Sequence, residues 1–158
     1  MFKDTIPIYY AGTAGHLFFC LHGAGESAMS FAALAKNLKA HSTVVTFDYR
    51  GHGDNTQDNE TDMSEETLIR DTLEVLAHVS QKFREASIIM VGHSMGGSIA
   101  TKTTHKILLE HVHEEMSKQI QGLYVIDVVE GSAMDALPFM ENIVNSRPPE
   151  FKSVQSAI

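Results

Sequence analysis

Residues 87–97 read Ser-Ile-Ile-Met-Val-Gly-His-Ser-Met-Gly-Gly, and this stretch decides the fold of the chain. The run 88–91 has the length and composition of a buried strand, and the residues from Ile99 onward are apolar at helical spacing. A serine between a strand and a helix, with glycine on both sides so that the backbone can turn sharply, is typical of a nucleophile elbow. The context predicts Ser94 as a nucleophile within the elbow glycines Gly92 and Gly96. The alternative is a chance Gly-x-Ser-x-Gly match in an ordinary loop.

The bulk properties exclude several classes of protein. A length of 158 residues with 43% apolar content predicts one folded domain over 1–158. The net charge of −8 argues against nucleic acid or an anionic membrane as a partner, because both attract basic surfaces. No apolar run is long enough to span a bilayer, and the first residues do not resemble a signal peptide. We expect a soluble intracellular protein, cytoplasmic and/or nuclear, with Cys20 as a buried structural thiol.

Hydrophobic patterning predicts an α/β fold. Apolar runs with no polar alternation suit a mostly parallel sheet whose two faces are both covered by helices. A good N-cap residue, Ser64, precedes one of the predicted helices. The predicted strands are 6–10, 17–21, 43–47, 88–91 and 122–126, and the predicted helices are 30–39, 64–84 and a segment from 99 onward.

A Gly-rich loop follows the second predicted strand. It reads His22-Gly23-Ala24-Gly25, and such small residues leave backbone N–H groups accessible. Acyl transfer needs two N–H donors aimed at the oxyanion, one of them from the residue after the nucleophile. We predict an oxyanion hole formed by Met95 N–H together with Ala24 or Gly23. The alternative is a plain connection between a strand and a helix.

Asp127 follows the predicted strand 122–126 directly. In a parallel sheet it would lie at the same edge as Ser94, where such folds assemble their sites. We interpret Asp127 as the carboxylate that orients a catalytic histidine, the alternative being an aspartate that only caps the strand.

Other polar residues receive structural interpretations. Asp48 and Arg50 are expected to brace a tight loop, and His52 is not expected to take part in the chemistry. The segment 105–115, read as a helix end, contains three histidines and three glutamates. Since His111 and His113 would point in different directions on a helix, a solvated face is favoured over a metal site. No metal or cofactor is predicted.

These motifs resemble those of a known family. The general marks are residues 22–25, 48–53 and 92–97, which resemble the corresponding motifs of many α/β-hydrolases. The specific mark is residues 126–137, Ile-Asp-Val-Val-Glu-Gly-Ser-Ala-Met-Asp-Ala-Leu, with 147–148, 151–153 and 157–158 further along. Together they resemble the protein phosphatase methylesterase family. The resemblance implies removal of the methyl ester from the carboxy-terminal leucine of the protein phosphatase 2A catalytic subunit, which would be the partner. It also implies that Ser94 is the nucleophile, Asp127 the triad acid, and the N–H groups of Ala24 and Met95 the oxyanion donors.

The chain also departs from that family. The family's triad histidine lies much further along, after a helical insertion, and His22, His52 and His93 do not occupy its place. The resemblance therefore implies a partial α/β-hydrolase, truncated before the lid and the last strands, from a fragmentary gene model, a splice form or a degenerate copy. Two alternatives to an esterase of this specificity remain open. One is a catalytically incomplete fragment that only binds the phosphatase, and the other is a generic carboxylesterase or lipase.

Overall fold

The computed structural model describes residues 5–127, 138–139, 142, 145–146, 148 and 150–153. The chain divides into two units, Met1–Val128 and Val129–Ile158, and every strand and helix named below lies in the first. The single domain expected over 1–158 stays a prediction. Most of the family-specific mark, residues 128–137, lies outside the described residues.

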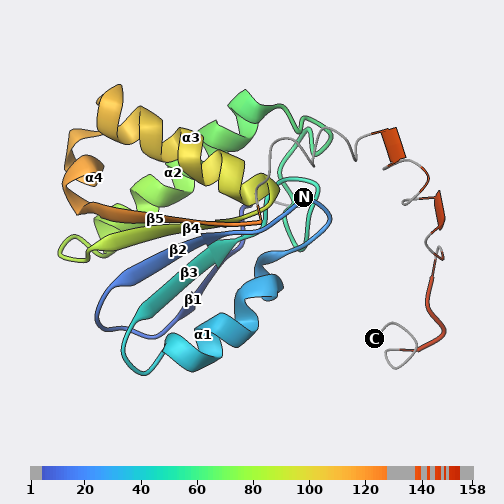
Figure 1. The fold of residues 1–158 in the computed structure, drawn as a ribbon, viewed down its shortest axis with the longest axis horizontal. Coiled ribbons are helices and arrows are strands. Elements are labelled where there is room, and N and C mark those ends of the chain that lie inside the picture. The colour runs from blue at the N-terminus through green and yellow to red at the C-terminus, as the bar shows by residue number, and fades with distance from the viewer. Residues whose placement is uncertain are drawn as a thin grey trace. The chain divides into compact units, whose positions relative to one another are not determined.

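The described strands of the first unit form one sheet in the order β1-β3-β2-β4-β5 (Figure 1). All neighbouring pairs are parallel except β1 and β3, which are antiparallel. The predicted mostly parallel sheet is confirmed. The strands are β1 (Ile8–Ala11), β2 (Leu17–Leu21), β3 (Thr43–Phe47), β4 (Ile88–His93) and β5 (Ile120–Ile126).

The central strands are the ones that sequence patterning located best. β2 and β3 coincide with the predicted runs 17–21 and 43–47, and every residue of β3 is buried. Such apolar and β-branched runs fit a sheet covered on both faces. The predicted bounds of the other three strands were wrong by one to two residues, because β1 begins at Ile8, β4 continues to His93 and β5 begins at Ile120.

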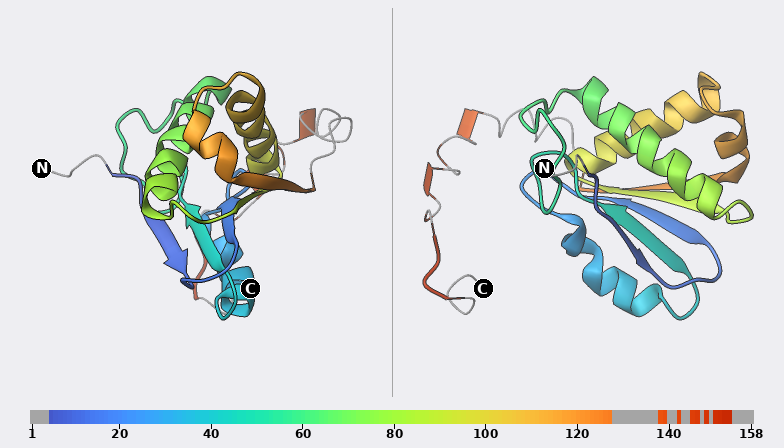
Figure 2. Two further views of the ribbon diagram at one scale, coloured as in Figure 1. Left: turned by 90° about the vertical axis from the view of Figure 1, so that its left-hand side faces the viewer. Right: turned by 180° about the vertical axis from the view of Figure 1, so that it is seen from behind.

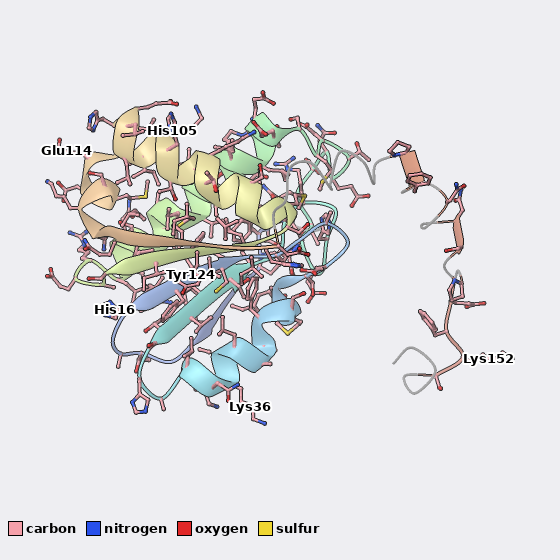
Figure 3. The ribbon with its side chains drawn as sticks, in the orientation of Figure 1. His16, Lys36, His105, Glu114, Tyr124 and Lys152 are labelled. Carbon is pink, nitrogen blue, oxygen red and sulfur yellow. The ribbon has the colours of Figure 1, made fainter. Side chains whose placement is uncertain are left out.

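Helices cover both faces of the sheet, as predicted (Figure 2). α1 (Ala32–Leu38) lies on one face, and α2 (Glu65–Lys82) and α3 (Met95–Leu109) lie on the other. Figure 3 shows this division through Lys36 on α1 and His105 on α3, which extend from opposite sides. Among the described residues no helix has both the length and the apolar character needed to cross a membrane.

Each face of the sheet has its own apolar cluster. The larger one joins α2 and α3 to the sheet and includes Leu76 and Ile107, both fully buried. The smaller one includes Cys20 and Phe31, and Leu34, Ala35 and Leu38 of α1 pack against it. Cys20 is fully buried, as predicted, and burial raises the pKa of its thiol to about 12, so it remains a packing residue.

Three helical predictions need correction. The predicted helix 30–39 is a short 3-10 helix, Ala28–Phe31, followed by α1. Ser64 stands at the N-cap of α2, but its hydroxyl donates to Asp62 Oδ1 and makes no capping hydrogen bond. The segment 105–115 is not one helix end, because α3 ends at Leu109 and a separate helix, α4 (Glu114–Gln119), begins afterwards.

Strand β5 is one of the two edge strands of the described sheet, opposite β1. It pairs with β4 and with no other described strand. Its residues from Leu123 onward are all exposed, with Tyr124 at 68% (Figure 3). β5 therefore differs from β4, whose residues are buried or half-buried.

Candidate active site

Ser94 lies where β4 passes directly into α3. Its backbone has φ 50° and ψ −119°, a combination that side-chain-bearing residues rarely adopt. Its N–H donates to Ile126 O at 2.9 Å, and its carbonyl accepts from Gly97 N at 2.9 Å, so the turn is tied to both β5 and α3. Strained conformations that the surrounding structure enforces cluster at functional sites. The sharp strand-turn-helix expected around Ser94 is present.

The two elbow glycines are required by close backbone contacts. A Cβ atom on Gly92 would lie 2.3 Å from Gly96 O, and one on Gly96 would lie 2.2 Å from Leu21 O. Neither neighbour is the flexible end of a side chain, so the backbone itself would have to move. Glycine at positions 92 and 96 therefore allows the start of α3 to pack directly against the end of β2.

The Gly-rich loop after β2 packs against the Ser94 turn. A Cβ atom on Gly23 would come within 3.2 Å of Ser94 Cβ and 3.0 Å of His93 Nδ1. Gly23 N–H donates to Glu26 Oε2 at 2.9 Å, so this candidate oxyanion donor is already engaged. In the described part of the chain, no acceptor is found for the N–H of Ala24 or of Met95. Of the two loop candidates, Ala24 is the one that remains available.

Asp127 follows β5 at the same sheet edge as Ser94. His93 pairs with Ile126 in the ladder, so Ser94 and Asp127 are the next residues on neighbouring parallel strands. Asp127 has a positive φ of 53° and is exposed. The topology thus brings the two predicted residues to one edge.

His22 and His52 hold loops together at this edge. Tyr49 N–H donates to His22 Nε2 at 3.2 Å, so the proton of this ring is on Nδ1, which donates to Gly23 O at 2.8 Å. His22 is fully buried, and this burial lowers the pKa of its imidazole. By the same logic His52 accepts from Gly25 N–H at 3.0 Å and donates to Arg50 O. Both rings use both nitrogens structurally.

His93 forms the remaining histidine contact of the site. Its Nδ1 lies 3.1 Å from Glu26 Oε2. All nine histidines of the sequence fall within the described residues, and none of them hydrogen-bonds to Ser94 or Asp127 there. Among the described residues, the turn at Ser94 is thus formed without a histidine hydrogen-bonded to the serine.

Asp48 organises the loops beneath the site. It is 2% exposed, and its carboxylate accepts from Ala28 N at 2.7 Å and Asp54 N at 3.0 Å. Tyr9 Oη donates to it at 3.0 Å, and desolvation together with the two nearby aspartates raises the pKa of Tyr9 to about 12. The predicted bracing role of Asp48 is confirmed.

Arg50 has the bracing role predicted for it as well. Its Nε and Nη2 donate to the two carboxylate oxygens of Asp71 at 2.7 and 2.9 Å. Both side chains are almost fully buried, which is the setting in which a bidentate pair holds two elements in register. The loop after β3 is fastened to α2 by this pair.

The histidine-rich segment 105–115 lies far from this edge in the first unit. His105 on α3 has a side chain that is 58% exposed, and it lies near Glu110 at 3.9 Å (Figure 3). Within the described residues, no group of three or more His, Cys, Asp or Glu side chains is arranged to hold a metal ion.

Sequence reasoning missed Glu26. Its carboxylate contacts both the Gly-rich loop and His93, which is 67 residues away along the chain. The only sequence feature that could have indicated it is that Glu26 is the single charged residue in a loop of glycine, alanine and serine. No local pattern indicated its partners.

Residues 13–119 match the family model described as serine aminopeptidase, S33. Among curated proteins, protein phosphatase methylesterase 1 of Bos taurus is 38% identical over 99% of this chain and 39% of its own length. The protein of that name from Schizosaccharomyces pombe is 40% identical over 91% of this chain and 41% of its own. The chain thus spans about two fifths of the length of these relatives.

Solved structures share the fold. The structure of E-2-(acetamidomethylene)succinate hydrolase superposes with a TM-score of 0.71 and 22% identity, over 96% of this chain and 51% of that one. This likeness concerns the fold alone. The chain therefore belongs to the hydrolase family described as serine aminopeptidase, S33, has an α/β-hydrolase fold, and is similar in sequence to protein phosphatase methylesterases.

Proposed function

We propose that this chain carries the nucleophile and oxyanion portion of a serine carboxylesterase that demethylates the carboxy-terminal leucine of the protein phosphatase 2A catalytic subunit. The observation that carries the proposal is the backbone of Ser94, strained at φ 50° and ψ −119° between β4 and α3. The similarity to protein phosphatase methylesterases supports the substrate class.

In this mechanism Ser94 Oγ attacks the ester carbonyl and a general base takes its proton. The N–H groups of Ala24 and Met95 stabilise the oxyanion, and each donor of this kind is worth about 3–4 kcal/mol of barrier. Methanol leaves, and water then hydrolyses the acyl-enzyme. Asp127 would orient the imidazolium that receives the serine proton.

The group that would accept the Ser94 proton as general base is not identified among the described residues. None of the nine histidines hydrogen-bonds to Ser94 among the described residues. This observation favours a second candidate function, a module that binds the phosphatase catalytic subunit without turning over the ester. Loss of a triad member costs several orders of magnitude in rate, so the two functions differ measurably.

An ester-hydrolysis assay with a matched serine control separates the candidates. The substrate is a peptide ending in leucine methyl ester, and the variants are Ser94→Ala and Ser98→Ala. The proposal expects methanol release above background that Ser94→Ala abolishes and Ser98→Ala retains. No release, combined with retention of the phosphatase catalytic subunit on the immobilised chain, would instead support the binding module. Turnover of small acyl esters alone would point to a generic carboxylesterase.

A further inference from the structure

Glu26 joins the two halves of the candidate oxyanion hole. Its Oε2 accepts from Gly23 N–H at 2.9 Å in the loop after β2, and from His93 Nδ1 at 3.1 Å in the residue before Ser94. Within the described residues, no other side-chain hydrogen bond connects this loop to the nucleophile turn. The same oxygen therefore links both segments.

The two candidate donors lie one and two residues after these anchored positions. Ala24 comes after Gly23, and Met95 lies two residues after His93. The backbones of the two segments are already in close contact, since Gly96 touches Leu21 O and Gly23 lies against Ser94. Hydrogen bonds then hold the peptide groups of the loop, and Gly23 O, in the peptide that carries the Ala24 N–H, accepts from His22 Nδ1 at 2.8 Å and from Glu26 N at 3.2 Å. The hydrogen bond to Gly23 N–H fixes the peptide that precedes the Ala24 donor by one residue.

The surroundings of the Glu26 carboxylate strengthen these two hydrogen bonds. The side chains of Glu26 and His93 are 32% and 30% exposed, so water is partly displaced from the pair. Burial acts to raise the pKa of Glu26, but hydrogen bonds from Gly23 N–H and His93 outweigh it and hold that pKa below its ordinary value. Glu26 is thus ionised at neutral pH, and hydrogen bonds to an ionised acceptor are stronger than neutral ones.

We infer that Glu26 is a positioning residue that sets the spacing and orientation of the Ala24 and Met95 N–H groups by binding the Gly-rich loop and the nucleophile turn through one carboxylate oxygen. The catalytic consequence of this inference rests on the proposed function, whereas the structural link itself does not. Among the described residues no hydrogen bond joins Glu26 to Ser94, so its role is to position other groups.

Three substitutions separate geometry from charge. Glu26→Gln keeps an oxygen at the same reach, which can accept both hydrogen bonds without a charge. Glu26→Asp keeps the charge but is one methylene shorter, and Glu26→Ala removes both. Glu85→Gln serves as the control, because Glu85 is exposed and has no hydrogen bond or ion pair among the described residues.

The first measurement is amide hydrogen exchange at Gly23, read by NMR on the folded 158-residue chain. We expect Gly23 to exchange about tenfold faster in Glu26→Ala and Glu26→Asp than in the wild type, and Glu26→Gln and Glu85→Gln to stay within about threefold. Equal Gly23 exchange in the wild type and Glu26→Ala overturns the inference, whether or not the protein hydrolyses esters. If Glu26→Ala does not fold, Glu26→Asp against Glu26→Gln gives the same comparison.

The second measurement is ester hydrolysis. A positioning role lowers kcat by about tenfold in Glu26→Ala with KM unchanged, and Glu26→Gln restores most of it. A loss confined to KM, or an equal loss in Glu26→Gln and Glu26→Ala, would contradict the role in orienting the donors. Absence of turnover in the wild type counts against the proposed function alone, because the exchange experiment then still decides the link.

Discussion

The carboxyl ends of β4 and β5 lie side by side, yet they are constructed differently. Ser94 and Asp127 follow paired residues of neighbouring parallel strands, and both have positive φ angles, 50° and 53°. The Ser94 end is enclosed by the Gly-rich loop, by α3 and by glycines that admit no side chain. The Asp127 end follows an edge strand whose last residues are exposed. The comparison teaches that the turn at Ser94 is fixed by contacts within the first unit, whereas no hydrogen bond of Asp127 is found among the described residues.

The largest expected difference is between a glycine at the Ser94 end and a glycine inside the edge strand β5, in their tolerance of an added methyl group. Gly96→Ala would place a Cβ atom 2.2 Å from Leu21 O, whereas Gly122→Ala in β5 would meet only Ile89 side-chain atoms at 3.7 Å. We expect Gly96→Ala to lower the free energy of unfolding by about 3 kcal/mol. Gly122→Ala should change it by no more than about 0.5 kcal/mol. Urea denaturation of both variants measures the contrast, and equal losses would show that the Ser94 end is not specially constrained.

The second difference concerns pH. Buried His22 joins the loop after β3 to the Gly-rich loop, and its lowered pKa means that the folded state favours the neutral ring. Stability from this group is present above the ordinary histidine pKa of about 6.5 and is lost as the pH falls below it, by at most about 1.4 kcal/mol per pH unit.

The check is the free energy of unfolding between pH 7.5 and 5.5. His22→Asn removes this titration, so its stability should depend less on pH than that of the wild type. The exposed His78 provides the control, and His78→Asn should retain the wild-type dependence. If the free energy of unfolding of His22→Asn depends on pH as steeply as that of the wild type, the buried His22 ring is not the source of the acid sensitivity.

The smallest expected effect compares the two positive φ angles themselves. Ser94 combines φ 50° with ψ −119°, which costs a residue with a side chain about 1–3 kcal/mol. Ser94→Gly should therefore raise the free energy of unfolding by about 1 kcal/mol after the greater chain entropy of glycine is subtracted. Asp127→Gly should change it by less than about 0.5 kcal/mol, since aspartate tolerates positive φ. Thermal and urea unfolding of both variants measure these changes. A larger increase in the free energy of unfolding for Asp127→Gly than for Ser94→Gly would contradict this expectation.

The sequence was sufficient to predict the central sheet and the sharp strand-turn-helix at Ser94. β2 and β3 are continuous apolar runs bounded by turn residues, so their bounds follow from composition. The turn at Ser94 follows from glycine spacing between a strand and a helix, a local pattern with a local cause.

What the sequence did not reveal depends on the choice of side-chain partners, one of them distant along the chain, and on one short helix. Glu26 reaches His93 across 67 residues, and Ser64 donates to Asp62 instead of capping α2, since the neighbouring carboxylate accepts its hydroxyl. α4 has six residues, three of them charged, and no long apolar stripe from which to predict a helix. The engagement of Gly23 N–H likewise follows from the side chain three residues later, which motif reasoning does not weigh.

The central claim is that Ser94 is the reactive serine of this site. A fluorophosphonate probe attaches covalently to an activated serine, and peptide mass spectrometry identifies the modified residue. We predict an adduct on Ser94 that disappears in Ser94→Ala and persists in Ser98→Ala. An adduct on another residue, an adduct of equal yield in Ser94→Ala, or no adduct on the folded wild-type chain would contradict the claim.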